Sequence, residues 1–370
     1  MAKKKLLGLV AVLLTLSLLG AACTNNAGTE AAADTTTEVP TADNASADLR
    51  SGLTALLGEH VYLAALATGS ALRGDTAGFN AWAAALNGET NSNSADIVAA
   101  VRSAYGDDVG EAFNGLWRSR DHIDGFVRYT QAIAKDDRRA ADQAVADLTG
   151  YARSFGETMT QVNENLPAAA VEEGITMHAT TLIAVIDAQK AGNQQAVYSS
   201  LREAYHHMDE LAKTLAGRTP QFEAAAAALN GETASNSADI VGAIRSVYGD
   251  DVGDAFNGLW RSRDHIDGFV RYTQAVAKDD RRAAEQAVTD LTGYAKSFGE
   301  TMNQVNENLP AAAVEQEITG HATSLIAVID AQKANDAAGA ATGLREAAHH
   351  MSNTAKVLAE ATVARFPEKF

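Results

Sequence analysis

The chain has few of the residues that stabilise folds other than packed helices. Its 370 residues include 1 cysteine and 5 prolines, and aromatic residues make up 6% of them. A single cysteine excludes a disulfide within one chain, so packing alone must stabilise the fold. Alternating β-branched residues, which are typical of strands, are scarce, whereas the helix-favouring Ala, Leu, Glu, Gln and Arg are abundant. The composition therefore predicts an all-α protein.

Basic residues are also in short supply. The chain has 30 Lys and Arg against 47 Asp and Glu, which gives a formal net charge of −17. Such a surface repels nucleic acids, and no basic patch offsets the imbalance. No glycine-rich phosphate loop, nucleophile–base pair or pair of catalytic carboxylates stands out either. We therefore expect no nucleic-acid partner and no enzymatic activity.

The only long apolar run stands at the N-terminus. Three lysines precede residues 6–19, which are too few for a permanent membrane span. The small residues before Cys23 resemble a bacterial lipobox, in which the cysteine is acylated and becomes the new N-terminus. An ordinary secretory signal cleaved nearby is the alternative, but the only cysteine of the chain at this position favours lipid. We predict a signal peptide at 1–22 and an extracytoplasmic protein whose lipid anchor holds it to the bacterial cell membrane.

Residues 23–47 are polar and lack any apolar periodicity, which predicts a disordered tether. Beyond them the sequence is duplicated. Residues 115–132 return letter for letter at 258–275, which sets a repeat period of 143, and flanking segments return with them. Solenoid repeats are much shorter than this period, so the repeated unit has the size of a whole domain.

The apolar period from residue 48 onward is helical. It predicts one long helix at about 109–134 and another at about 194–216. The helix at about 194–216 is the last helix of the first repeat. It also stands one repeat period after the first helix, so it corresponds to the first helix of the second repeat. We predict two tandem antiparallel helical bundles, at 48–217 and 218–370.

Nine histidines lie near the midpoints of the predicted helices. Midpoints of antiparallel helices share one layer of a bundle, where side chains from different helices can converge on a metal. His60 and His178 also fall on apolar stripes, which directs them inward. Glu203 is a further candidate ligand, and it stands where the second repeat would need a copy of His60. The predicted ligands are His60, His122, His178, His207 and Met208 in the first repeat, and His265, His321, His350 and Met351 in the second.

Neutral imidazoles bind copper, zinc, nickel or iron, and a thioether favours copper among them. The ordinary alternative is that each histidine is a hydrogen-bonded residue of the core rather than a metal ligand. Because four inward-facing histidines are expected at the same level of the first bundle, we give the two interpretations equal weight. A di-iron site is disfavoured because Ile175 stands where a second Glu is needed. Two functions stay open: a transition-metal-binding protein, with copper favoured and zinc or iron possible, or a metal-free structural or protein-interaction module.

Four segments carry a resemblance to known proteins: LLGEH at 56–60, GLWRSRDH from 115, EAYHHM at 203–208 and FPEKF at 366–370. Together they resemble a group of helical-bundle proteins of unassigned function, which are secreted or lipid-anchored in bacteria. Some of that group stand beside a stalk-like domain named after copper amine oxidase N-termini. The resemblance spans nearly all of the chain after Ala47 and implies a helical bundle at the cell surface. It transfers no catalytic residue.

Overall fold

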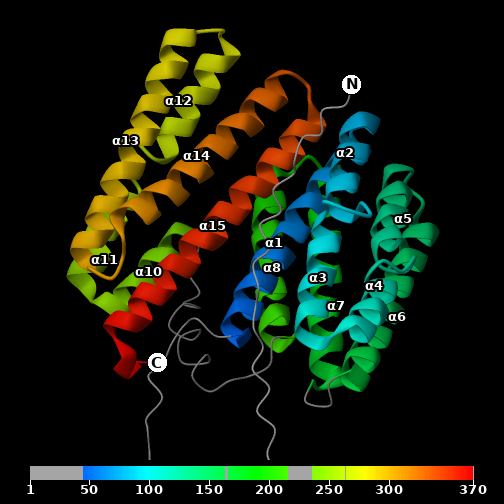
Figure 1. The fold of residues 1–370 in the computed structure, drawn as a ribbon. Coiled ribbons are helices and arrows are strands. Elements are labelled where there is room, and N and C mark those ends of the chain that lie inside the picture. Colours follow the sequence, from blue (N-terminus) through cyan, green and yellow to red (C-terminus); the bar gives the residue numbers. More distant parts are fainter. Residues whose placement is uncertain (1–44, 163–165, 216–235, 263, 370) are drawn as a thin grey trace, which may run out of the picture. The chain divides into compact units, whose positions relative to one another are not determined.

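Helices make up nearly all of the computed structural model, which describes residues 45–162, 166–215, 236–262 and 264–369. Within those ranges the chain forms α-helices and one short 3-10 helix, and no strand, so the predicted all-α class is confirmed (Figure 1). The helices are α1 (Ala45–Leu72), α2 (Thr76–Asn87), α3 (Asn93–Tyr105), α4 (Asp107–Trp117), α5 (Ile123–Ala134), α6 (Arg138–Val162), α7 (Ala168–Lys190), α8 (Gln194–Leu215), α10 (Asn236–Tyr248), α11 (Asp250–Trp260), α12 (Ile266–Ala277), α13 (Arg281–Val305), α14 (Ala311–Lys333), α15 (Ala337–Arg365) and η1 (Pro367–Lys369).

Several predictions concern residues outside those ranges. The signal peptide at 1–22, Cys23 and all but the last residues of the tether at 23–47 lie outside the described residues, and so does the start of the second predicted bundle at 218–235. The described helices belong to one compact unit, Val39–Phe370. The division of that unit into two tandem bundles stays a prediction.

The duplication of the sequence reappears in the helices. The bounds of α13 and α14 follow those of α6 and α7 by one repeat period, and α11 and α12 follow α4 and α5 by the same displacement. The starts of helices are capped by the expected residue types. Ser92 accepts a hydrogen bond from the amide of Ala95 before α3, and Asp280 accepts one from the amide of Ala283 before α13. Local sequence therefore determines where these helices begin.

The predicted long helix at 109–134 is wrong, because the chain turns between α4 and α5. Arg118 ends α4, and its guanidinium donates hydrogen bonds to the carbonyls of Asn87 (2.8 Å) and Gly88 (3.0 Å) at the end of α2. His122 then immediately precedes α5, with φ −91° and ψ −88°. His122 thus lies in a turn rather than at mid-helix, and the same break recurs between α11 and α12, where the same letters return.

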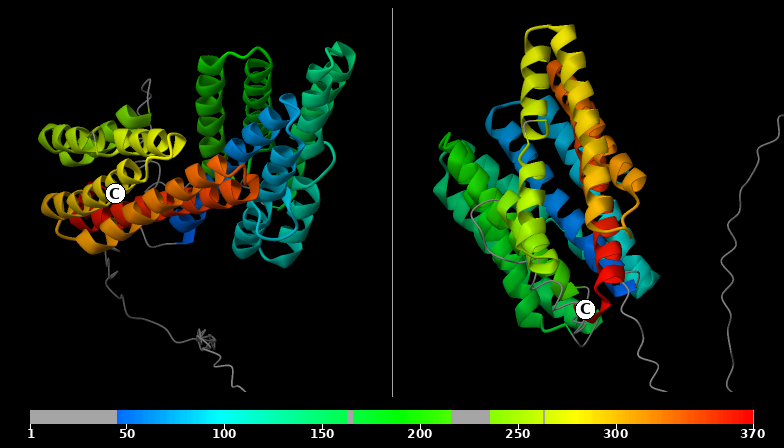
Figure 2. Two further views of the ribbon diagram at one scale, coloured as in Figure 1. Left: turned by 90° about the horizontal axis from the view of Figure 1, so that it is seen from above. Right: turned by 90° about the vertical axis from the view of Figure 1, so that its left-hand side faces the viewer.

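Helix α1 lies at the centre of the first repeat. It packs against α2, α3, α5, α7 and α8, and α15 also contacts both α1 and α2. Helices α7 and α8 run side by side, joined by a short turn that is clear from above in Figure 2. The core around α1 is built on large buried side chains, among them Leu53, Phe113, Trp117 and Phe155. Polar groups on the inner face of α1 are consequently held among rigid apolar neighbours.

Candidate metal centre

Three buried histidines converge in the first repeat. His60 comes from α1, His122 from the turn before α5 and His178 from α7, and each is 1% exposed. One ring nitrogen from each lies within 4.8 Å of the other two. Nitrogens bound to one tetrahedral zinc stand roughly 3.3 Å apart, because each lies about 2 Å from the metal. Small rotations of the three rings would therefore bring their nitrogens to ligand distance.

Hydrogen bonds select which nitrogen of each ring is the donor to a metal. The Nδ1 of His122 lies 2.7 Å from the carbonyl oxygen of Trp117. A carbonyl only accepts, so Nδ1 carries the hydrogen and Nε2 keeps its lone pair. That Nε2 is buried without a hydrogen-bond partner. In His60, Nδ1 lies 3.2 Å from the side-chain oxygen of Asn93, which likewise leaves Nε2 with the free lone pair.

His178 is the least satisfied of the three. Both of its ring nitrogens are buried and neither has a hydrogen-bond partner. A buried polar atom left in this state costs about 1–3 kcal/mol. Buried polar atoms in folded proteins are rarely left so, and each exception calls for an explanation. A metal ion bound by His178 would supply the missing interaction.

Burial keeps the three rings neutral. It lowers the pKa of His122 to about 4 and that of His178 to about 3. The pKa of His60 falls well below 6.5, chiefly through burial and then through the neighbouring rings of His122 and His178. A neutral imidazole is the form that binds a metal, so all three rings are ready to bind at pH 7.

Aromatic side chains hold the rings in place. The ring of Trp117 lies 5.0 Å from that of His60 and 4.7 Å from that of His122, measured between centroids. Tyr151 stacks on His122 at 4.7 Å with an interplanar angle of 5°. Burial raises the pKa of the Tyr151 hydroxyl well above 10, so this residue is a neutral wall of the site. Packing of this kind limits the rings to small rotations.

A cleft of about 510 Å³ borders the triad at His60. It lies between α1, α2 and α5, and His60 forms part of its wall together with apolar residues such as Phe79 and Phe126. The described residues that line it include the exposed carboxylates Asp75 and Asp124 and no lysine or arginine. The electrostatic field of such an opening attracts cations. The cleft therefore brings a cation-attracting opening to the wall formed by His60.

Two of the other predicted ligands of the first repeat, His207 and Glu203, do not join this group. His207 on α8 has a buried Nε2 without a partner and is close enough to contribute to the lowered pKa of His178. It nevertheless lies outside the set of nitrogens that are within 4.8 Å of one another. Met208 is fully buried among core residues, and Glu203 is exposed on α8. The structure thus brings together three of the four predicted histidines.

The second repeat reproduces only part of the site. His265 copies His122: its Nδ1 lies 2.8 Å from the carbonyl of Trp260, and its ring stacks on Tyr294 at 4.8 Å. The position of His60, however, maps to Glu203, which is exposed. Among the described residues of the second repeat, no three histidines or carboxylates gather as the triad does.

The remaining predicted ligands of the second repeat have partners or neighbours of their own. The Nδ1 of His321 lies 3.2 Å from the carbonyl of Ala347, and the Nδ1 of His350 lies 2.8 Å from a carboxylate oxygen of Glu317. Met351 lines a small cavity together with His265 and His321. Among the described residues, His265, His321 and His350 therefore do not gather as the first triad does, because Glu203 stands at the position that corresponds to His60.

The site also includes polar residues that the sequence did not single out. Asn93 belongs to a polar run of Asn and Ser, yet it is 0% exposed and contacts His60. Glu59 is 4% exposed and accepts a hydrogen bond of 2.9 Å from Asn93. No sequence pattern points to either role, since both arise from contacts between residues more than 30 positions apart.

Two helices, Leu49–Leu72 within α1 and Ala168–Lys190, have the length and hydropathy of membrane spans. This is weak support for a span, because buried core helices meet the same criterion, and both of these contribute histidines to the triad.

Neither a family model, nor a curated protein, nor a solved structure matches the chain. The chemistry of the triad therefore carries the functional conclusion.

Proposed function

We propose that this protein binds a transition-metal ion through His60, His122 and His178. The observation that carries the proposal is the convergence of three buried nitrogens within 4.8 Å from three separate segments. A core histidine ordinarily finds a hydrogen-bond partner, whereas His178 has none at either nitrogen. Metal binding accounts for both the convergence and the missing partners.

The donor set favours copper or zinc. Three neutral imidazoles without a carboxylate suit either ion, and iron is a weaker candidate. Copper is our first choice because Met208 is buried on helix α8, which packs against α1 and α7, and a thioether is a soft ligand that prefers Cu(I). Three protein ligands also leave a coordination position for an exchangeable group. The cleft has His60 in its wall, on one side of the triad.

Binding is tested by pairing His122 with its repeat counterpart. H122A and H265A remove histidines with the same carbonyl hydrogen bond and the same tyrosine stack, but only the first belongs to the triad. Mature protein stripped with chelator is titrated with Cu(I), Cu(II) and Zn(II) against a chromophoric competitor. We expect one tight site per chain in the parent and in H265A. Binding in H122A should be weakened by more than the roughly 10–100-fold that loss of an outer-shell partner causes.

The titration has two outcomes that would overturn the proposal. One is a parent that binds none of these ions tightly, and the other is equal weakening in H122A and H265A. Either result would leave the alternative, a metal-free structural or interaction module. Under that alternative, alanine at His60 or His178 costs about 1–3 kcal/mol of packing, and added metal leaves the melting temperature unchanged.

We also propose that the protein works outside the cytoplasm, attached to the cell membrane by lipid on Cys23. The support is the apolar run at 6–19 and the position of the only cysteine. Mass spectrometry of the N-terminal peptide tests this. We expect a diacylated Cys23 as the first residue, and an unmodified peptide that begins elsewhere would contradict it.

The duplication supports the further proposal of two tandem bundles, since the repeated helices share their lengths and spacing. Limited proteolysis between 216 and 235 tests this arrangement. Two protease-resistant fragments are expected, and degradation without such fragments would argue against separate bundles.

A further inference from the structure

A buried polar chain connects the triad to the last long helix of the protein. It begins at His60, whose Nδ1 lies 3.2 Å from the side-chain oxygen of Asn93. The side-chain nitrogen of Asn93 donates to a carboxylate oxygen of Glu59 at 2.9 Å. The other carboxylate oxygen of Glu59 accepts from Nε of Arg345 on α15 at 2.7 Å. Arg345 lies 286 residues from Glu59 in the sequence, so the second repeat contacts the site of the first.

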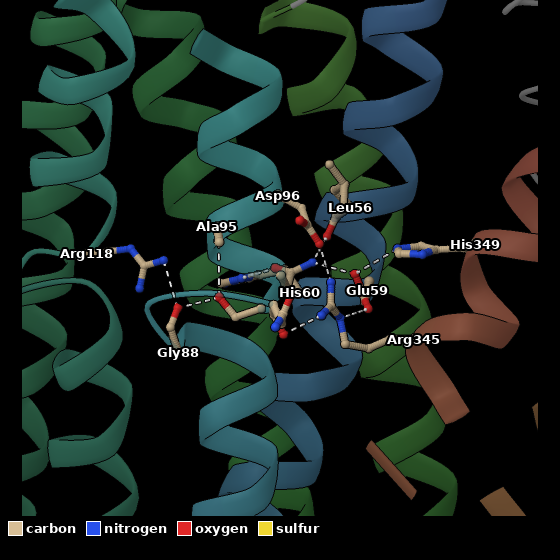
Figure 3. Close-up of polar contacts among 12 residues, drawn as sticks. Leu56, Glu59, His60, Gly88, Ala95, Asp96, Arg118, Arg345 and His349 are labelled. Carbon is tan, nitrogen blue, oxygen red and sulfur yellow. Dashed lines mark hydrogen bonds and ion pairs between the residues drawn. The ribbon is translucent and has the colours of Figure 1, made fainter. Parts of the chain in front are cut away.

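Figure 3 shows how Arg345 is held. Its guanidinium reaches from α15 to Glu59 on α1 and also pairs with Asp96 on α3. A third hydrogen bond goes to the carbonyl of Asn91 at 2.8 Å. The side chains of Arg345 and Glu59 are 12% and 2% exposed, so the pair is shielded from water. His349 lies nearby, with its Nε2 4.0 Å from Glu59.

The orientation of the Asn93 amide is the critical step. Its nitrogen donates both to the carbonyl of Leu56 at 2.7 Å and to the carboxylate of Glu59. A flipped amide would place its oxygen against these two acceptors, which is unfavourable. The amide oxygen is therefore directed at His60, and it accepts the Nδ1 hydrogen. The lone pair of His60 is left on Nε2, the nitrogen that faces away from Asn93.

We infer that Arg345 is a positioning residue for the triad. It holds the carboxylate of Glu59 against Asn93, which keeps His60 in the tautomer that can bind a metal. Residues that fix the tautomer and direction of a ligand histidine typically change metal affinity about 10–100-fold when they are replaced. The second repeat thus controls the metal affinity of the first, and this control rests on the proposed metal binding.

The test uses R345Q in the full mature chain, with R271Q as the matched control. Arg271 likewise pairs with two carboxylates, Asp264 and Asp290, on a half-buried surface of the second repeat that lies outside this polar chain. The ring nitrogens of His60 are followed in the metal-free protein by long-range proton–nitrogen correlation spectra. Affinities for Cu(I) and Zn(II) are then measured by competition.

We expect the parent and R271Q to show the Nδ1–H tautomer of His60 and equal metal affinities. R345Q frees the Glu59 carboxylate to turn away from Asn93, which leaves the Leu56 carbonyl alone to orient the amide. It should then show a mixture of the two tautomers and an affinity about 10–100-fold lower. R345Q also leaves the Glu59 carboxylate buried without its partner, which can unfold the protein. The double variant E59Q/R345Q removes both charges. The glutamine amide introduced by E59Q can turn either way, so it does not fix the Asn93 amide. We therefore expect the double variant to show the same mixture of His60 tautomers and the same loss of metal affinity as R345Q.

Parent-like tautomer and affinity in folded R345Q and E59Q/R345Q would overturn the inference. Failure of the proposed function is distinguishable, because it would appear as a parent that binds no metal. The tautomer spectra need no metal, so they decide the positioning role even then.

Discussion

Replacing His178 with leucine should stabilise the metal-free protein while abolishing metal binding. Both ring nitrogens of His178 are buried without partners, and the side chain is 1% exposed. Each unsatisfied buried polar atom costs about 1–3 kcal/mol, and an apolar side chain of similar shape removes that cost. Part of the gain is lost because leucine does not match the shape of the imidazole. We expect a net increase of about 1–2 kcal/mol in the free energy of unfolding.

The same substitution at His122 should act in the opposite direction. H122L loses the hydrogen bond to the carbonyl of Trp117 and the stack on Tyr151, so it should destabilise the metal-free protein by about 1–3 kcal/mol. Urea denaturation at pH 7.5 with excess chelator measures both variants, and circular dichroism verifies their helix content. When zinc or copper ions are added instead of chelator, the free energy of unfolding should rise in the parent and stay unchanged in H178L and H122L. A destabilised H178L would refute the reasoning, because it would mean that the nitrogens of His178 are satisfied in the folded protein.

Two further predictions concern pH and backbone packing. Burial lowers the pKa of His122 to about 4 and that of His178 to about 3, whereas both histidines of the unfolded chain take up protons near pH 6.5. The unfolded chain therefore binds more protons below pH 6.5. The free energy of unfolding of the metal-free protein should be level above pH 7 and fall below pH 6.5, by up to about 1.4 kcal/mol per pH unit for each histidine. Urea midpoints between pH 8 and pH 5 measure this fall; it should be shallower in H178L, and equal slopes in the two proteins would contradict it. A methyl group added at Gly156 would lie 2.5 Å from the carbonyl oxygen of Ala168, whereas one at Gly150 on the same helix meets nothing within 4 Å. G156A should therefore lower the free energy of unfolding by about 1–3 kcal/mol, whereas G150A should leave it unchanged or raise it. Equal urea midpoints for the two variants would show that α6 and α7 do not cross closely.

The helical class and much of the triad could be predicted from apolar spacing. His60 and His178 fall on apolar stripes, and the side chain of a residue on such a stripe faces the core whatever packs against it. Both are buried as expected. His122 was expected inside a helix but lies in the turn between α4 and α5, a break that recurs between α11 and α12 in the same letters. It still points inward, since Trp117 and Tyr151 enclose its ring.

The second repeat shows why repeated letters do not guarantee a repeated site. Its copy of His122 keeps the same local contacts, because residues close in sequence provide the carbonyl of Trp260 and a neighbouring helix provides Tyr294. A triad also needs an imidazole from a distant helix, and the duplicated position holds Glu203. The second repeat has copies of His122 and His178 but none of His60, so the three-histidine group is not repeated.

By itself the sequence determined the helices, their repetition along the chain, the acidic charge and the inward direction of two histidines. These properties depend on residues within a few turns of one another, so the linear pattern contains them. Tertiary structure alone decided that His122 meets His60 and His178 from a turn, that His207 stays outside the group, and that Arg345 reaches Glu59 across 286 residues. Such contacts depend on how whole helices pack, and a long-range hydrogen bond between polar residues has no period along the chain that would reveal it.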